Sequence, residues 1–286
     1  MEVKGLIQGS NTWKLWRQSH LGASDAPIIM NVGFKTPLRL WQEKMGVEIP
    51  YVNDAMRRGT LLEPVALAEF NKLMGEEFSP AVFVSDEYHW MSASLDGMNF
   101  EGTEAVEIKL AGSKDHATAL KGFVPEKYMP QLQHQMFVCN LPEIYYYSFD
   151  GTAGVLLVIP RDEEFISELI SKEADFYRRM VEFDAPPENY EDWIVSNDNQ
   201  LQYHLSEYDN WKIAFDDAKE NMEKHKQWIV DFASGNNLKC KGMKVQKIVS
   251  QGRVDYDAIE VLQSIDLTAY RKKPTESWRI IKDNGK

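Results

Sequence analysis

The stretch from Val106 to Leu110 contains two side chains whose types and spacing suit hydrolytic chemistry. Successive side chains of a β-strand point to opposite faces, so Glu107 and Lys109 share one face and the apolar residues share the other. The apolar face suits burial, and the opposite face directs a carboxylate and an ammonium group to one point. We therefore expect this strand to present an acid and a lysine side by side.

A second carboxylate precedes this strand. Asp96 lies in a segment that Gly97 allows to turn tightly, and the returning strand would bring Asp96 beside Glu107. Two carboxylates suit Mg²⁺, a hard cation that prefers oxygen ligands, and the Ile108 carbonyl could supply a further oxygen. Lys109 would then orient a nucleophile and stabilise charge that develops on phosphorus. These residue types predict metal-assisted hydrolysis of a phosphodiester.

The acid pattern by itself is common, and the chain contains a second Glu-x-Lys at Glu2–Lys4 that has no upstream acid. An ordinary strand with a solvated charged edge is therefore the alternative. Glu63 has two interpretations that do not exclude each other: it completes a capping box with Thr60 at a helix start, and it faces the metal pocket from that helix. Gln131 and Gln133 open a later helix, either toward this site or as amides in solvent.

The elements that must position these residues are predicted by hydrophobic periodicity and by turn residues. The order of helices and strands favours a mixed α/β core that ends near residue 185, followed by a linker at Pro186-Pro187. We expect an α/β core that carries the predicted hydrolytic site over 1–185, and a mostly helical extension with a basic tail over 186–286. The expected elements are helices over 13–22, 24–30, 36–46 and 60–75, strands over 81–88 and 105–110, a helix from Pro130, a strand hairpin around Gly151, and helices over 161–183 and 203–233. Ser24 and Asp25 are the expected caps of the second helix.

Composition limits the class of protein. The chain has 286 residues, 43% of them hydrophobic, which is typical of a globular protein. Two cysteines are too few for a disulfide framework, so we expect a reducing cytoplasm, with neither a secretion signal nor a membrane span. The net charge of −12 argues against a broad surface that coats nucleic acid. The acidic excess lies mainly in 161–236, and a basic excess in 237–286 either contacts DNA or docks on the acidic segment.

Six pieces of this sequence resemble, in order, the phage-type exonucleases of the lambda exonuclease and YqaJ viral recombinase group, within the PD-(D/E)xK nuclease superfamily. They begin with the tryptophan-arginine helix and "LGASDA", and continue with "TPLRLWQEKMG", "RRGTLLEPVA", "SASLDGM", "VEIKL" and "YMPQLQHQMFV". The resemblance implies a restriction-endonuclease-like α/β core in which a mixed central sheet is flanked by helices. The family usually has proline where this chain has Leu95, which leaves the ligands in place and changes the local turn.

The resemblance also implies a role for individual residues. Those implied in catalysis are Glu63, Asp96, Glu107, Lys109, Gln131 and Gln133. Metal ligation is implied for Asp96, Glu107 and the carbonyl of Ile108, with Glu63 serving a second metal or acting through water. The residues implied at the 5′-phosphate of DNA are Arg17, Ser24 and Ser94. His134 adjoins the glutamines and is expected to be an ordinary helix residue, not a ligand.

The activity implied by the resemblance is cleavage of double-stranded DNA from 5′ ends, with two Mg²⁺ ions for which Mn²⁺ substitutes. The 3′ overhangs would serve a single-strand annealing recombinase, inside a host bacterial cell. A ring-shaped homotrimer would surround the DNA with a basic lining drawn from Arg17, Lys35, Arg57, Arg58, Lys109, Lys114 and Lys121. The alternatives are a structure-specific or nicking endonuclease of the same fold, and a catalytically silent DNA-binding or interaction protein.

Overall fold

The computed structural model describes residues 1–3, 5–47, 54–252 and 258–259. The chain divides into two compact units after Trp193, and each is described by itself. Much of the basic tail, including the expected mixed pattern after residue 253, lies outside the described residues. The assignment of 1–185 as the nuclease core and 186–286 as its extension stays a proposal.

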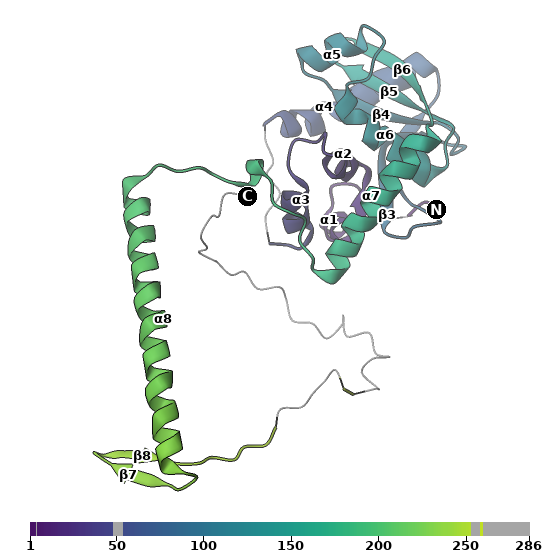
Figure 1. The fold of residues 1–286 in the computed structure, drawn as a ribbon. Coiled ribbons are helices and arrows are strands. Elements are labelled where there is room, and N and C mark those ends of the chain that lie inside the picture. Colours follow the sequence, from purple (N-terminus) through teal and green to yellow (C-terminus); the bar gives the residue numbers. More distant parts are fainter. Residues whose placement is uncertain (4, 48–53, 253–257, 260–286) are drawn as a thin grey trace. The chain divides into compact units, whose positions relative to one another are not determined.

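A mixed six-stranded sheet forms the centre of the first unit (Figure 1). Its strands are β1 (Leu21–Gly22), β2 (Phe78–Val84), β3 (Met91–Asn99), β4 (Ala105–Leu110), β5 (Glu143–Phe149) and β6 (Gly154–Pro160). The main order is β1-β3-β4-β5-β6, and β2 pairs with β3 off this path. β1 with β3 and β4 with β5 are parallel pairs, and the other three pairs are antiparallel.

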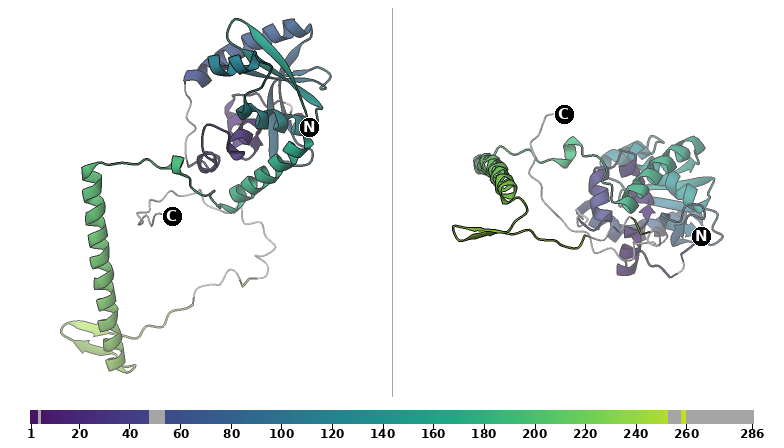
Figure 2. Two further views of the ribbon diagram at one scale, coloured as in Figure 1. Left: turned by 45° about the horizontal axis from the view of Figure 1, so that its top comes forward. Right: turned by 60° about the horizontal axis from the view of Figure 1, so that its bottom comes forward.

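Helices cover both faces of this sheet (Figure 2). On one face, α4 (Asp54–Met74) packs Ala66 and Phe70 against Phe78 and Val106. On the other face, α5 (Ser113–Ala119) and α6 (Met129–Cys139) enclose a core that includes Leu132, Met136, Leu95, Ile144 and Tyr146. A sheet covered on both faces explains why β4 is buried over its first four residues, including a charged one.

The remaining helices build a third layer of contacts near β1. They are α1 (Asn11–Gln18), α2 (Ala26–Ile29), α3 (Pro37–Lys44) and α7 (Glu163–Glu182), with 3₁₀ turns at Ala23–Asp25, Glu126–Tyr128 and Tyr190–Asp192. Side-chain oxygens of Ser10, Thr36 and Asp162 cap α1, α3 and α7 by accepting backbone N–H groups. Leu21, Ile28, Leu40, Phe176 and Met180 form the shared core of this layer.

The outer edge of β2 is covered by the first residues of the chain. Val3 donates its backbone N–H to the carbonyl of Val82 over 2.8 Å, and Val84 donates to the carbonyl of Met1 over 2.9 Å. A bridge between Glu2 and Phe83 lies between these two bonds. Residues 1–3 therefore extend the sheet by one short segment.

The second unit contains α8 (Asn199–Ala233) and a short hairpin of β7 (Leu238–Cys240) and β8 (Met243–Val245). Asp198 caps α8 by accepting the N–H of Leu201 over 2.8 Å. Ala233 is the single buried residue of this 35-residue helix within the described part of the chain. The helix was expected from the sequence and the hairpin was not. No helix among the described residues is long and apolar enough to span a bilayer.

Three local expectations were wrong. α4 begins at Asp54, so Thr60 and Glu63 lie inside the helix and form no capping box at its start. Ser24 and Asp25 lie in a 3₁₀ turn before a four-residue helix; Asp25 occupies the N-cap position of that helix, but neither side chain accepts a helix N–H, so the expected side-chain cap is absent at these two residues. Gly97 lies within β3, and the chain turns later, around Gly102, whose φ of +72° favours glycine.

Gly97 has a packing role instead of a turn role. A Cβ atom at this position would lie 2.8 Å from Cγ1 of Val106 and 2.9 Å from Cβ of Phe78. Cδ1 of Leu67, from α4, would lie 3.1 Å away. Side chains of β4, β2 and α4 therefore approach the backbone of β3 immediately beside Asp96. The glycine allows the sheet and α4 to pack closely at the point where the acids gather.

Candidate active site

The acids lie where the ladder between β3 and β4 ends. These strands pair at Gly97 with Val106 and at Met98 with Ala105. Beyond those pairs the backbone N–H of Ile108 donates to Oδ2 of Asp96 over 2.7 Å. A carboxylate thus takes the place of a backbone acceptor, and this holds Asp96 beside β4.

Glu107 is buried and held by three donors. Lys109 Nζ and Gln131 Nε2 each donate to its Oε1 over 2.6 Å, and Gln135 Nε2 donates to its Oε2 over 2.5 Å. Lys109 Nζ also donates to Oε1 of Gln131 over 2.9 Å. The expected pairing of Glu107 with Lys109 is present, and its geometry is fixed by amides from α6.

The spacing along α6 explains which glutamines reach the acid. Gln131 and Gln135 are four residues apart and share one helix face, which points to Glu107. Gln133 points elsewhere: its Nε2 donates to the Pro160 carbonyl over 3.0 Å, and its Oε1 accepts the N–H of Asp162 over 2.9 Å. Sequence reasoning missed Gln135, although its i,i+4 relation to Gln131 was the signal that could have found it. The role assigned to Gln133 stays a prediction.

The charges of the site are not balanced. Burial and the neighbouring charges of Glu107 and Glu63 raise the pKa of Asp96 well above its usual 3.8. Burial and Glu107 also raise the pKa of Glu63, which approaches from α4. Burial opposes the charged form of Lys109, but Glu107 and Asp96 outweigh it and raise the pKa of that lysine. Three carboxylates therefore share one ammonium group.

This donor set fits a divalent cation. Repulsion among buried carboxylates is relieved when a cation binds between them, and carboxylate oxygens are the ligands that Mg²⁺ prefers. Within the described ranges, three or more His, Cys, Asp or Glu side chains nowhere converge as a ready-made metal cage. Mg²⁺ uses one or two protein carboxylates and keeps several waters, so a full cage is not required. Asp96 and Glu107 are the residues that would hold it.

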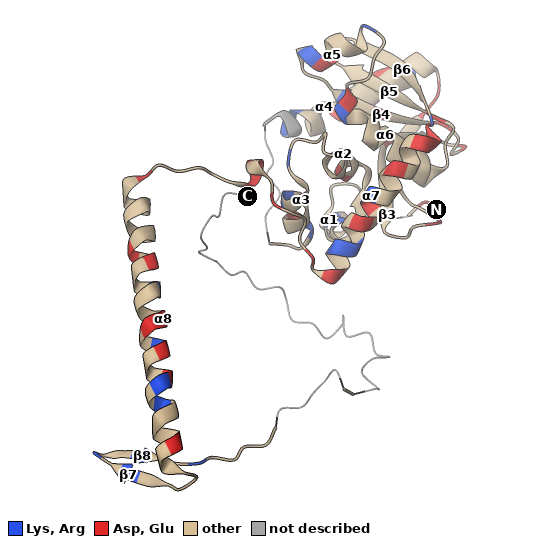
Figure 3. Cartoon of the chain, in the orientation of Figure 1, with Lys and Arg blue, Asp and Glu red and all other residues tan. Residues whose placement is uncertain are grey.

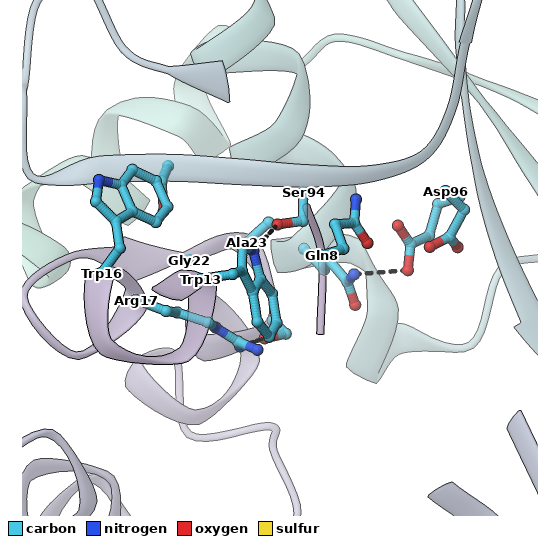
Figure 4. A pocket seen from close by; sticks show the side chains of 12 residues that line it. Gln8, Trp13, Trp16, Arg17, Gly22, Ala23, Ser94 and Asp96 are labelled. Atoms are coloured by element: carbon cyan, nitrogen blue, oxygen red, sulfur yellow. Dashed lines mark hydrogen bonds between the residues drawn. The ribbon is translucent and has the colours of Figure 1, made fainter. Parts of the chain in front are cut away.

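A pocket adjoins the acids and connects them with α1 and the turn after β1 (Figure 4). Nε1 of Trp13 donates to Oγ of Ser94 over 3.2 Å, and the Arg17 guanidinium lies 5.0 Å from the centre of the Trp13 ring. Arg17 also donates to Oγ of Ser24. The pocket is lined by Gln8, Trp13, Trp16, Arg17, Gly22, Ala23, Ser24, Ser92, Ser94, Asp96, Glu107 and Gln131. The three residues expected at a phosphate therefore line the same hollow as both proposed metal ligands.

A buried ion pair supports the Arg17 side of the pocket. Lys44 Nζ lies 2.6 Å from Oδ2 of Asp25 and donates to the carbonyls of Arg17 and His20. Oδ2 of Asp25 also accepts the N–H of Gly22 over 2.9 Å. Burial opposes ionisation of Asp25, but Lys44 and Arg17 outweigh it and lower its pKa to about 2. Asp25 therefore fixes the turn before α2 as an anion rather than capping the helix.

A second buried pair, His134 and Glu173, contacts the backbone of β3. His134 is fully buried; its Nδ1 lies 2.8 Å from Oε1 of Glu173, and its Nε2 lies 2.9 Å from the Ser92 carbonyl. Burial opposes protonation, but the Glu173 carboxylate outweighs it and raises the pKa of His134. His134 thus links α6, α7 and β3, in keeping with the expectation that it is not a metal ligand.

The expected basic lining is assembled only in part. Lys109 lies at the acids, and Arg17 lies in the adjoining pocket. Lys35 forms an ion pair with Glu43, and both side chains are largely buried there. Its charge is therefore partly neutralised within the chain.

The sequence that forms this site is similar to known proteins. Residues 12–142, which include Arg17, Glu63, Asp96, Glu107 and Lys109, match the family model of the YqaJ-like viral recombinase domain. Over this stretch the chain is similar to the YqaJ-like viral recombinase domain. It is also 28% identical over 238 residues to the uncharacterized protein YqaJ of Bacillus subtilis strain 168, covering 80% of this chain and 73% of that protein.

A similar fold is also found among solved structures. The crystal structure of an alkaline exonuclease from Laribacter hongkongensis aligns with a TM-score of 0.54 and 23% identity, over 61% of this chain and 94% of that one. The same exonuclease in complex with dAMP aligns equally well. The expected α/β nuclease-like fold, with a mixed sheet flanked by helices, is thereby confirmed.

Proposed function

We propose that this protein is a Mg²⁺-dependent deoxyribonuclease that degrades double-stranded DNA from 5′ ends. The main supporting observation is that three carboxylates, Glu63, Asp96 and Glu107, gather around the single ammonium group of Lys109. Two of these acids, Asp96 and Glu107, also line the pocket that contains Arg17, Ser24 and Ser94. Acids that can bind a cation, next to a guanidinium and two hydroxyls that can donate hydrogen bonds to a phosphate, suit hydrolysis beside a terminal phosphate. The exonuclease fold and the dAMP complex of the Laribacter enzyme support this choice.

The residues of the chain divide the work as follows. Asp96, Glu107 and the Ile108 carbonyl would hold Mg²⁺, with Glu63 serving a second ion or a bound water. The metal supplies Lewis-acid polarisation of the phosphate and a more acidic water. Lys109, fixed by Glu107 and Gln131, holds an ammonium group where negative charge develops on phosphorus. Arg17 would bind the terminal phosphate through its planar fork, with hydroxyls from Ser24 and Ser94.

The proposed partners follow from the products. Digestion from 5′ ends leaves 3′ single strands, which a single-strand annealing recombinase would coat. A homotrimeric ring would keep the enzyme on its duplex, and Mn²⁺ would substitute for Mg²⁺ because both accept oxygen ligands.

Digestion of linear duplex DNA with 5′-phosphate ends, linear duplex with 5′-hydroxyl ends and covalently closed circles tests the proposal. We expect Mg²⁺-dependent degradation of the linear DNAs, fastest with 5′-phosphate, and none of the circles. Lys109→Ala should lower the rate by about 10²–10³-fold, whereas Lys172→Ala, which removes an exposed lysine on α7, should not.

Three other outcomes of this assay would each contradict a specific part of the proposal. Cleavage of circles would indicate a structure-specific or nicking endonuclease instead. Equal rates for Lys109→Ala and the unsubstituted protein would overturn the catalytic assignment. Good DNA binding without turnover in Mg²⁺ or Mn²⁺ would indicate a catalytically silent binding protein.

A further inference from the structure

α8 exposes an apolar stripe that repeats every seven residues. The members of the first row are Leu201, Tyr208, Phe215, Met222 and Ile229. Their exposed fractions lie between 39% and 66%, although all five are large apolar side chains. A seven-residue repeat falls slightly short of two helical turns, and a row of apolar side chains with this period is the pattern of a left-handed coiled coil, in which the row occupies the a positions.

A second row completes the stripe. The d positions, three residues after each a position, hold His204, Trp211, Ala218, His225 and Phe232. Trp211 and Phe232 are exposed by 71% and 68%. Polar residues at isolated core positions lower the stability of a coiled coil and select one register, because only the in-register pairing places them opposite each other. The two histidines therefore favour a partner with the same sequence aligned in the same direction.

The charges beside the stripe also select the direction. The e positions hold Leu205, Lys212, Lys219, Lys226 and Ala233, and the g position five residues before Lys212 holds Glu207. In a parallel pair, g of one helix faces e of the next heptad in the other, so Glu207 meets Lys212 of its copy. In an antiparallel pair, e faces e and brings lysines together. Acidic residues and lysines are interleaved along α8 (Figure 3).

We propose that α8 forms a parallel coiled coil with α8 of a second copy of this chain. The a and d side chains become buried between the two helices, and the aliphatic parts of the lysines at e pack along the edge of the contact. The proposal is independent of the proposed nuclease function, because α8 contains none of the residues at the acid cluster or its adjoining pocket.

Disulfide formation in the full-length chain tests this pairing. Ile229→Cys places a thiol at an a position near one end of the helix, so parallel pairing brings two such thiols together. Gln227→Cys is the matched control, because it lies at an f position near the same end and on the opposite face. Both are made with Cys240→Ser, which removes the exposed native thiol. Cys139 is retained, since burial raises the pKa of its thiol to about 12 and leaves little reactive thiolate.

Under mild oxidation we expect the Ile229→Cys protein to form a covalent dimer on non-reducing gels, much faster than the Gln227→Cys protein. Equal rates would overturn the proposal. No dimer with Ile229→Cys alone, but rapid coupling of Ile229→Cys protein to His204→Cys protein, would show antiparallel pairing and overturn the parallel arrangement.

A second pair of changes tests the stripe itself. Phe215→Asp added to the Ile229→Cys protein should slow its cross-linking, because a carboxylate would be buried at an a position. Ile213→Asp, an equal change at an f position that is 52% exposed, should leave the rate unchanged. Equal effects of the two changes would indicate that another surface brings the copies together. Circular dichroism checks that both variants keep α8 helical.

Discussion

At the scale of single residues, Asp96 carries an electrostatic cost that the proposed metal would relieve. Glu107 and Glu63 raise its pKa, so ionised Asp96 destabilises the metal-free fold. Asp96→Asn removes this charge and keeps an oxygen that can accept the N–H of Ile108. We expect it to abolish nuclease activity and to raise the free energy of unfolding in EDTA at neutral pH by about 1–2 kcal/mol. Urea titration measures this change.

The same shift sets a pH dependence. The folded state binds the Asp96 proton more tightly than the unfolded state, so stability should fall as pH rises from about 3.8 through the raised pKa. Asp96→Asn should remove this part of the fall. Parallel stability profiles for the two proteins between pH 4 and neutrality would contradict the assignment.

Two glutamines of α6 have different partners: Gln135 donates to Glu107 in the proposed active site, and Gln133 bonds with backbone groups of Pro160 and Asp162 outside it. Gln135→Ala deprives the buried Oε2 of Glu107 of its donor, and we expect nuclease activity to fall about 10–100-fold, as for other residues that orient ligands. Gln133→Ala removes two hydrogen bonds near Pro160 and should cost about 1–2 kcal/mol of stability without a comparable loss of rate. Steady-state kinetics at saturating Mg²⁺, together with urea titration, distinguish the two. A larger rate loss for Gln133→Ala would reverse the assignment.

At the scale of elements, close packing of α4 and β2 on β3 gives Gly97 its importance. Gly97→Ala would press a methyl group against Val106 and Phe78, and we expect it to cost about 1–3 kcal/mol. Gly252→Ala is the matched control, because Gly252 has no positive φ and has open space around it. Thermal unfolding compares them, and an equal effect of the two substitutions would contradict the packing argument.

The strand and helix periods predicted much of this arrangement. Alternation in β4 placed Glu107 and Lys109 together, and the turn around Gly151 predicted the hairpin of β5 and β6. The strand position of Gly97 was missed, because it depends on packing between distant segments rather than on local preference. Gln135 was missed for a similar reason: its carboxylate partner is 28 residues away along the chain.

At the scale of the whole molecule, the acid cluster and its pocket lie in the first unit, which contains residues 1–193. If α8 serves only to join copies, a chain ending at Trp193 should unfold cooperatively and hydrolyse linear DNA with the Mg²⁺ dependence of the full chain. Calorimetry and the digestion assay test this expectation. A folded but inactive truncation would show that residues after 193 contribute to the reaction itself.

The short pairing of residues 1–3 with β2 has a practical consequence. An uncovered strand edge offers free N–H and C=O groups to any other extended chain, and this promotes aggregation. Met1 and Val3 occupy those groups along Val82–Val84. The N-terminal ammonium also donates to the Val84 carbonyl over 2.6 Å. Val3→Pro removes the N–H that pairs with Val82, so it should weaken this cover and lower the yield of soluble protein compared with the unsubstituted chain.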